Sequence, residues 1–397
     1  MAASDRRIDL DWVRILAFAL LILYHVGMYY VTWSWHVKSP YASTTLEPLM
    51  RLSSPWRLSL LFFVSGSATA FLHAKSATGF VRSRTQRLLI PLAFGLWVVV
   101  PPQSWAEVTE AVGYDGGYLH FMLLYANGYA GFCREDCLRV PTWNHLWFVA
   151  YLWCYTMVAA CAWWLLPQAW IARVAAALAR RLHGPWLFVW PVTVLAAVRI
   201  ALVARFPATD ALVDDWFQHA NYLGVFMMGL LLAREANAWE QIRRQRWPAL
   251  ALAGLGYAMV TIYFTHYAKI APPDWLRQVQ RVFHALDEWA AIVAALGFAR
   301  QWNPADSRAR RYLTEAIFPF YIVHQTAIVV LAHFIKPLGL RPLVEGPLLI
   351  AATVAICCAS FEIVRRVGWM RPLFGLAPTA AHVLPAGLAG PVRPGRA

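Results

Sequence analysis

Three ionisable residues, Asp11, Arg14 and His25, stand in one apolar, helix-length run near the amino terminus. An α-helix turns about 100° per residue, so this spacing places all three on one stripe, with Arg14 and His25 about 16 Å apart along the axis. A neutral imidazole can take a proton from a hydroxyl and later return it, which makes His25 a candidate general base. Asp11 and Arg14 are three residues apart and can pair directly. The alternative interpretation is structural: an ion pair at the helix end and a hydrogen-bonded core histidine.

Arginines crowd a second stretch, "FVRSRTQRLLIP", directly before another apolar run. Arg82, Arg84 and Arg87 present three forked guanidinium groups, which suit a phosphate or carboxylate ligand. We therefore treat them as candidate donor-binding residues. The alternative is the ordinary positive charge of a cytoplasmic loop.

Three further polar residues near the ends of apolar runs are candidates for lining a cavity: His145, His324 and Glu362. Ionisable groups inside a membrane are costly, and they usually mark a polar path or site. Glu362 can instead pair with Arg365 or Arg366 at helical spacing, which favours a structural role.

Other kinds of catalytic site find no support in the sequence. It contains no G-x-S-x-G and no H-E-x-x-H motif, so serine-hydrolase and zincin chemistry are not indicated, and we expect no metal site. Cys133 and Cys137 fall in a predicted loop and could form a small disulfide if that loop faces an oxidising compartment.

The composition is that of a membrane protein. Of the 397 residues, 60% are hydrophobic and only 14% charged, and the mean hydropathy is +0.47. A soluble chain would carry about a quarter charged residues. We predict an all-α integral membrane protein with a transmembrane domain over residues 1–376 and a disordered, Pro/Gly-rich cytoplasmic tail over 377–397. Ten windows are apolar enough for spans of about 20 residues: 12–32, 55–73, 88–105, 143–166, 185–204, 216–233, 247–266, 282–300, 313–335 and 346–366.

The basic residues are distributed asymmetrically between the connecting segments. With the amino terminus inside, the predicted cytoplasmic segments and their flanks hold 22 Lys and Arg, and the opposite loops hold 10. This is the pattern that the positive-inside rule produces, so both termini are predicted to be cytoplasmic. The net charge of +14 lies in short clusters between apolar runs, and we expect no nucleic-acid partner.

The opening motif resembles that of a known family. The pattern from Arg6 through "LDWVRILA", followed by the intramembrane His25, is similar to the start of the membrane-bound acyltransferase 3 family. The likeness continues in order along nearly the whole chain, in "LLFFVSGSATAFL", "RSRTQRLLIP", "HLWFVAYL" and "FPFYIVHQTAIV". Here "VSGSATA" departs from the family pattern, which often has a tyrosine or phenylalanine after the glycine.

The resemblance implies a ten-span enzyme of the bacterial inner membrane, with no tightly bound cofactor. Such an enzyme takes an acyl group from cytoplasmic acyl-CoA and esterifies an extracytoplasmic carbohydrate. His25 corresponds to the family's essential histidine, Arg14 to the motif arginine, and Arg84 and Arg87 to the donor-binding pair. "YHVGMYYVTWSWHVKS" and the "FEIVRR…RPLFG" ending are most similar to members that succinylate osmoregulated periplasmic glucans.

These features predict a mechanism and leave alternatives open. We expect His25 to act as general base on a sugar hydroxyl that attacks the thioester of succinyl-CoA or acetyl-CoA. Arg14 would stabilise the oxyanion or orient the imidazole. The alternatives are an O-acetyltransferase for another envelope polysaccharide or lipid, and a proton-coupled transporter.

Overall fold

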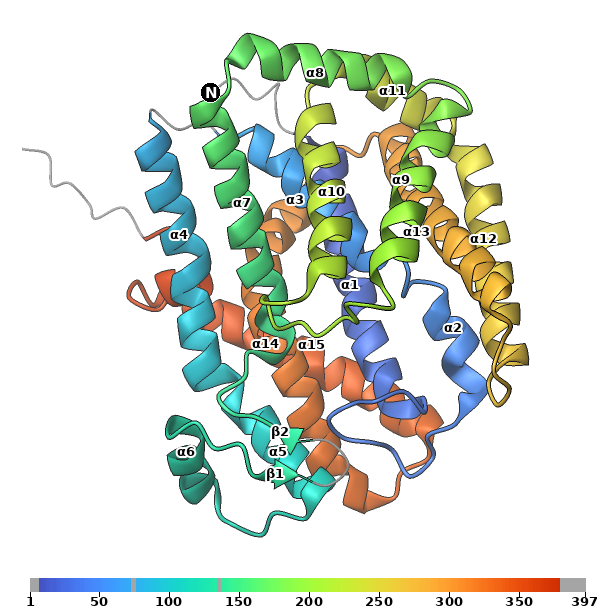
Figure 1. Ribbon diagram of the computed structural model, residues 1–397. Coiled ribbons are helices and arrows are strands. Elements are labelled where there is room, and N and C mark those ends of the chain that lie inside the picture. Colours follow the sequence, from blue (N-terminus) through green and yellow to red (C-terminus); the bar gives the residue numbers. More distant parts are fainter. Residues whose placement is uncertain (1–6, 73–75, 134–136, 379–397) are drawn as a thin grey trace, which may run out of the picture.

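The body of the protein is a bundle of long helices, most of which run between its two ends (Figure 1). The structure is a computed structural model that describes residues 7–72, 76–133 and 137–378. The predicted tail lies almost entirely outside the described residues. The principal helices of the bundle are α1 (Ile8–Tyr30), α3 (Arg57–Ala70), α4 (Ala77–Phe94), α7 (Trp147–Leu165), α9 (Trp186–Leu202), α10 (Trp216–Leu232), α12 (Arg246–His266), α13 (Asp274–Trp302), α14 (Arg308–Ile335) and α15 (Pro342–Arg366).

Shorter elements connect and cover these helices. The α-helices are α2 (Glu47–Arg51), α5 (Pro101–Val112), α6 (Tyr118–Ala126), α8 (Gln168–Arg181) and α11 (Ala236–Arg244). Single turns of other helix types are η1 (Thr44–Leu46), η2 (Gly95–Val99), η3 (Asn144–Leu146), η4 (Lys336–Leu338) and η5 (Pro372–Phe374). Two short antiparallel strands, β1 (Phe132–Cys133) and β2 (Cys137–Leu138), pair with each other.

The predicted count of ten spans is not confirmed, although a helix lies over every predicted window. Within the described ranges, six helices are long and apolar enough to cross a membrane, or up to eight if two bent helix pairs each count as one span. Two of the ten windows contain helices that are too short to count as spans: α3 has 14 residues and α10 has 17. At 1.5 Å per residue they reach only about 21 and 26 Å, less than a hydrocarbon core of about 30 Å.

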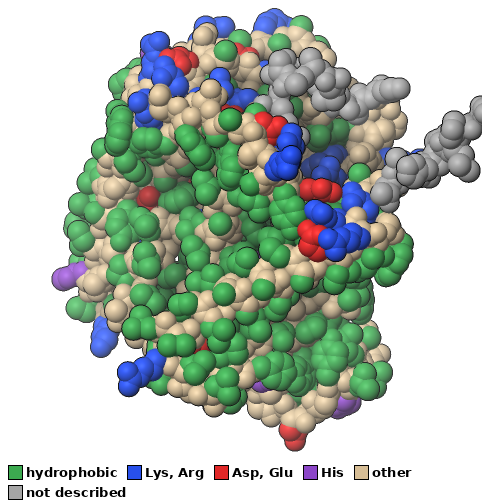
Figure 2. Space-filling view, turned by 180° about the vertical axis from the view of Figure 1, so that it is seen from behind, with side chains coloured by type: hydrophobic (Ala, Val, Ile, Leu, Met, Phe, Trp, Pro, Cys, Tyr) green, Lys and Arg blue, Asp and Glu red, His purple; other side chains and the backbone are tan. Residues whose placement is uncertain are grey.

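The two bent pairs have different causes. From Ala77 to Val112 the chain bends by 43° at the break between Val99 and Pro101, where the π-helical turn η2 ends and α5 begins with two prolines. Between α8 and α9 the bend is 110°, because α8 lies across one end of the bundle (Figure 1). Lys and Arg side chains gather toward this end above a broad hydrophobic surface (Figure 2), and the positive-inside rule predicts it to be the cytoplasmic end.

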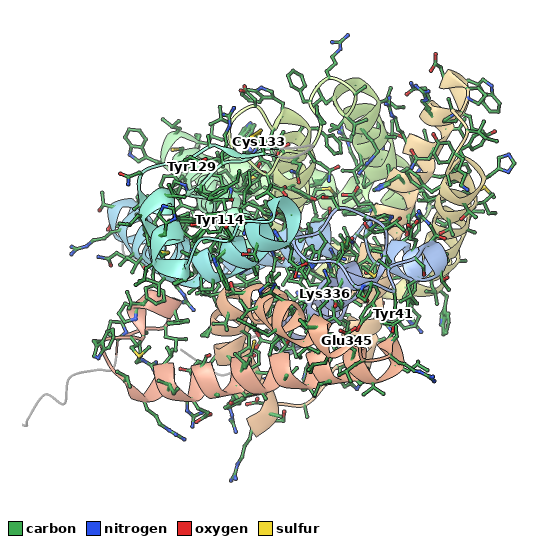
Figure 3. All side chains as sticks on the ribbon, turned by 90° about the horizontal axis from the view of Figure 1, so that it is seen from below. Tyr41, Tyr114, Tyr129, Cys133, Lys336 and Glu345 are labelled. Carbon is green, nitrogen blue, oxygen red and sulfur yellow. A yellow bond between two sulfur atoms is a disulfide. The ribbon has the colours of Figure 1, made fainter. Side chains whose placement is uncertain are left out.

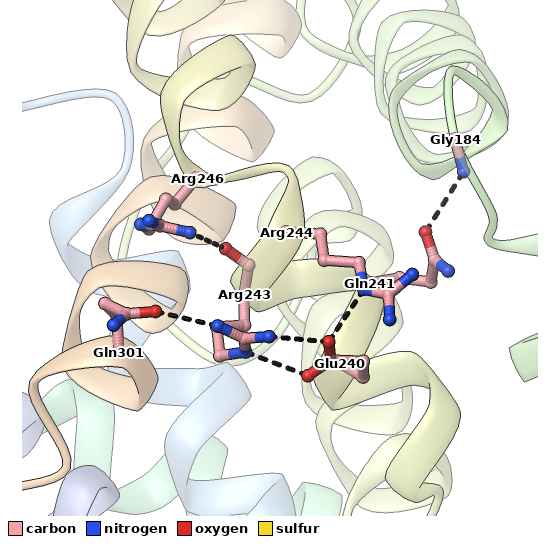
Figure 4. Close-up of polar contacts among 7 residues, drawn as sticks. All are labelled: Gly184, Glu240, Gln241, Arg243, Arg244, Arg246 and Gln301. Atoms are coloured by element: carbon pink, nitrogen blue, oxygen red, sulfur yellow. Dashed lines mark hydrogen bonds and ion pairs between the residues drawn. The ribbon is translucent and has the colours of Figure 1, made fainter.

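The surface helix α11 at this end is fixed by polar contacts (Figure 4). Gln241 accepts a hydrogen bond from the Gly184 backbone before α9, and Arg243 donates to Gln301 of α13. Hydrogen bonds from Arg243 and then Arg244 lower the pKa of Glu240 to about 2, so this carboxylate stays ionised at neutral pH.

The opposite end carries the segment from α5 to β2 (Figure 3). Cys133 and Cys137 form a disulfide across the paired strands, a pairing that the sequence left open. Tyr125 anchors α6, because its hydroxyl donates to the backbone carbonyls of Leu96 and Thr142 at 2.9 Å.

Helices α3 and α10 approach each other unusually closely at two glycines. A Cβ atom on Gly66 would lie 2.0 Å from the Phe226 carbonyl oxygen, and one on Gly229 would lie 2.0 Å from the Phe63 carbonyl oxygen. The hydroxyl of Ser67 also donates to the Gly229 carbonyl at 3.0 Å. Small residues let helix backbones meet in this way inside membranes, and the contact holds the first half of the bundle against the second.

Candidate active site

A cavity of about 510 Å³ opens between α1, α3, α7 and α14. Helix α1 contributes Arg14, Phe18, Leu21 and His25, which follow one another at spacings of four, three and four residues. The cavity continues to Trp35 and His36 after α1 and to the loops at 142–145 and 209–211. Arg14 and His25 therefore share one polar space, as their eleven-residue spacing predicted.

His25 is paired with a histidine almost three hundred residues away. Its Nδ1 lies 3.0 Å from Nε2 of His324, and the two rings stack with centroids 5.1 Å apart. Nδ1 of His324 lies 2.7 Å from the carbonyl oxygen of Tyr321, which can only accept, so this nitrogen carries a proton. In the neutral ring Nε2 then accepts, and Nδ1–H of His25 donates to it. The network leaves Nε2 of His25 with its lone pair, the form that a general base requires.

His145 supports this pair from the start of α7. Its Nε2 donates to the carbonyl of Ile322 at 3.1 Å, and its ring meets that of His324 edge-on at 5.2 Å. The hydroxyl of Tyr321 donates to the backbone carbonyl of His145. The structure thus brings together the three histidines that the sequence singled out. His25 and His145 line the cavity, and His324 lies fully buried behind His25.

Arg57 was missed in the sequence analysis. It begins α3, lines the cavity with His25, and is only 4% exposed. Its guanidinium carbon lies 3.5 Å from the centre of the Tyr24 ring, and Nη1 donates to Ser53 at 3.3 Å. Among the described residues no carboxylate pairs with it, and its buried Nε has no hydrogen-bond partner. The sequence did contain a signal for Arg57, since a charged residue at the edge of an apolar run rarely enters a membrane without a function.

The arginines of α4 lie toward the end of the bundle that α8 covers (Figure 1). Arg84 lies close enough to Arg87 and Arg14 to be repelled by their positive charges. Its buried Nε has no hydrogen-bond partner within the described part of the chain. Arg82 and Arg87 are both exposed, whereas Arg84 is half-buried. Neither Arg84 nor Arg87 lines the cavity, whereas Arg14 does. Arg14 therefore lies between the α4 arginines and the cavity.

Two predicted site residues lie elsewhere. Asp11 accepts a hydrogen bond from Arg310, which is 1% exposed, and this ion pair ties α1 to α14. Glu362 pairs with Arg365 at 3.3 Å and Arg366 at 2.7 Å, as its spacing predicted, and does not line the cavity.

The outer mouth of the cavity carries a second polar group. His36 Nδ1 lies 2.7 Å from a carboxylate oxygen of Glu107, and its Nε2 lies 2.9 Å from the amide nitrogen of Gln325. Trp35 and His36 also line a neighbouring cavity of about 390 Å³ that reaches Glu107 and the β1–β2 segment. These two residues separate the inner cavity from the outer surface.

Fold and site together define a multi-pass membrane protein with an internal cavity lined by His25, Arg14 and Arg57. The chain belongs to the acyltransferase 3 family, because the family's sequence model, described as an acyltransferase domain, matches residues 7–362. This membership supports a membrane acyltransferase over a transporter. The searches of curated proteins and of solved structures gave no match.

Proposed function

We propose that the protein transfers a succinyl or acetyl group from cytoplasmic acyl-CoA to a hydroxyl of an extracytoplasmic glucan, in the bacterial inner membrane. The observation that carries this proposal is the chain of contacts from the Tyr321 carbonyl through His324 to Nδ1 of His25, on the wall of a cavity shared with Arg14 and Arg57. This chain assigns the proton to Nδ1 and leaves the lone pair on Nε2 of His25. Membership of the acyltransferase 3 family supports the reaction class.

In this reaction His25 is the only residue that takes up and returns the proton. Nε2 takes the proton of the sugar hydroxyl while the oxygen attacks the thioester carbonyl and forms the new C–O bond. The tetrahedral intermediate then collapses, the C–S bond breaks, and the leaving CoA thiolate takes the proton back from His25. The bond from Nδ1–H to His324 holds the ring in position and stabilises the charge that it gains during the step.

Arg57 supplies the buried positive charge that such an intermediate needs. A guanidinium in a largely dehydrated cavity stabilises a developing oxyanion more strongly than it would in water. The same cation also favours an acyl group that carries its own carboxylate, so we expect succinyl-CoA to be preferred to acetyl-CoA. Resemblance of the first span and of the carboxyl-terminal segment to glucans biosynthesis protein C supports the same donor.

The donor approaches from the side of α4. The phosphates of CoA are bulky and polyanionic, and Arg84 and Arg87 offer guanidinium groups near the cytoplasmic end of the bundle. From there the pantetheine arm reaches past Arg14 to His25, about 16 Å further along α1.

The acceptor approaches from the opposite end. Trp35 and His36 line both the inner cavity and the outer one, and the outer cavity also carries Glu107. An aromatic ring beside a carboxylate suits a sugar, since the ring stacks on its apolar face and the carboxylate accepts from its hydroxyls.

Mass spectrometry of periplasmic glucans tests this proposal. Cells that make the wild-type protein should yield glucans heavier by succinyl or acetyl groups, and cells that lack it or carry His25→Ala should not. A glucan mass that is the same in all three strains would overturn the glucan acceptor. If a lipid or another polysaccharide were acylated instead, that molecule would be the acceptor.

A further inference from the structure

A second cationic cavity, separate from the one that holds His25, lies where the ends of α9 and α12 meet α13, α2 and the chain after α1. It has a volume of about 530 Å³. Four arginines and one histidine line it, without any acidic residue among the described lining residues: Arg51, Arg199, Arg277, Arg281 and His284. Trp33, Tyr263 and Phe264 complete its polar and aromatic wall.

Two further arginines of the cavity keep donors that no carboxylate uses. Arg199 is 15% exposed and forms an ion pair with the buried Glu288, whose Oε2 lies 3.6 Å from its Nη2, but the buried Nε of Arg199 has no hydrogen-bond partner among the described residues. The other oxygen of Glu288 already accepts from Ser59 at 2.5 Å and Asn221 at 2.7 Å. Arg281 donates only to uncharged oxygens, those of Ile200 and Gln278, and no carboxylate in the described segments pairs with it.

The remaining arginines of the cavity each pair with a carboxylate beside them. Arg277 pairs with Asp274 at 3.3 Å, and Arg51 pairs with Glu47 at 2.8 Å. Asp274 is 91% exposed, so water screens its pairing with Arg277 and leaves this guanidinium able to bind a second anion. Nδ1 of His284 is buried and has no hydrogen-bond partner within the described ranges.

The surroundings of the cavity are apolar and exposed. Ile200, Ile262 and Val282 flank it with exposed fractions of 40%, 60% and 41%. Arg199 and Phe264 lie at the carboxyl-terminal ends of α9 and α12, on the side predicted to be extracytoplasmic. The positive-inside rule does not account for arginines gathered on that side, so their clustering requires another cause.

We propose that this cavity binds the phosphate of an anionic phospholipid from the outer leaflet. The forked guanidinium groups of Arg199, Arg277 and Arg281 suit the phosphate oxygens, and the exposed apolar side chains beside them suit the acyl chains. The proposal does not depend on the acyltransferase activity, because the cavity shares no residue with the one that holds His25.

Native mass spectrometry of the full-length protein in nonionic detergent tests it, with phosphatidylglycerol, phosphatidylcholine and inorganic phosphate as separate probes. We expect tight binding of phosphatidylglycerol alone. The double variant Arg277→Gln/Arg281→Gln should bind it at least about tenfold more weakly, since a hydrogen bond to a charged group is worth about 1.5 kcal/mol or more. The control is Arg180→Gln/Arg181→Gln, which removes the same charge from the exposed end of α8 and should bind like the wild type.

Three results would overturn the proposal. The first is equal affinity for phosphatidylglycerol and phosphatidylcholine. The second is equal loss in both double variants, which would indicate attraction by net charge. The third is inorganic phosphate binding as tightly as the lipid, which would assign the cavity to a soluble anion. Arg199→Lys keeps the charge opposite Glu288 and, if the proposal holds, should weaken lipid binding while the protein stays folded.

Discussion

At the scale of single residues, the proposed reaction requires a proton on Nδ1 of His25 and a free lone pair on its Nε2. The contact of Nδ1 with His324, which is itself held by the carbonyl of Tyr321, favours this tautomer. A change at His324 should therefore act through His25 and leave substrate binding intact.

We predict that His324→Leu lowers kcat at least about tenfold and leaves the KM for acyl-CoA unchanged, because it removes the acceptor of Nδ1–H. His324→Gln retains an oxygen that can accept this bond and should recover part of the lost rate. Steady-state kinetics of the purified variants measure both effects. Equal loss in the two variants would contradict a positioning role.

Arg57 should decide between donors. We expect Arg57→Met to lower the ratio of succinyl to acetyl transfer by roughly tenfold or more, since a charge-assisted bond to the succinyl carboxylate is lost. Arg57→Lys, which keeps the charge, should retain most of the preference. Parallel assays with the two CoA esters measure the ratio. If succinyl and acetyl transfer fall to the same degree, Arg57 acts only by stabilising the oxyanion and does not select the donor.

The residues that could be predicted from sequence are those whose relation is local. Helical periodicity was enough to place Arg14 and His25 on one stripe and to pair Glu362 with its neighbouring arginines. The partner of His25 could not be predicted, because His324 is 299 positions away and only the packing of α1 on α14 brings it near. Asp11 likewise pairs with the distant Arg310.

At the scale of elements, hydrophobic patterning located every long helix but not the role of each one. The windows over α3 and α10 predicted full spans, whereas the structure has two short helices whose backbones touch at Gly66 and Gly229. This contact is a tertiary property, and a hydropathy window cannot detect it.

Two glycines of α10 provide a matched test of that contact. Gly229→Ala should destabilise the protein by about 1–3 kcal/mol, because its Cβ meets the Phe63 carbonyl. Gly224→Ala, on the exposed face of the same helix, meets nothing within 4 Å and should be neutral or slightly stabilising. Thermal unfolding in detergent compares them. Equal midpoints for the two variants would contradict close packing of α3 on α10.

The arginines of α4 should act on donor binding. We expect Arg84→Ala/Arg87→Ala to raise the KM for acyl-CoA by roughly tenfold or more, with a smaller effect on kcat. Arg82→Ala, an exposed position on the same helix, is the control and should change neither. If the KM for acyl-CoA is the same in the double variant as in the wild type, these arginines do not bind the donor and contribute only to the orientation of the protein in the membrane.

At the scale of the whole molecule, one cavity extends along α1. Its wall runs from Arg14 past His25 to Trp35 and His36. In the proposed reaction, a donor that enters beside Arg14 and an acceptor that enters beside Trp35 would meet at the imidazole of His25, and no separate transport step would be needed.

The most direct test of this account is acyl transfer by purified protein carrying His25→Ala. We predict a loss of about 10²–10⁴-fold in kcat, the usual contribution of a general base, with the thermal midpoint and gel-filtration profile of the wild type. A folded His25→Ala protein that retained near wild-type transfer would show that the proton is taken elsewhere, and would contradict the account.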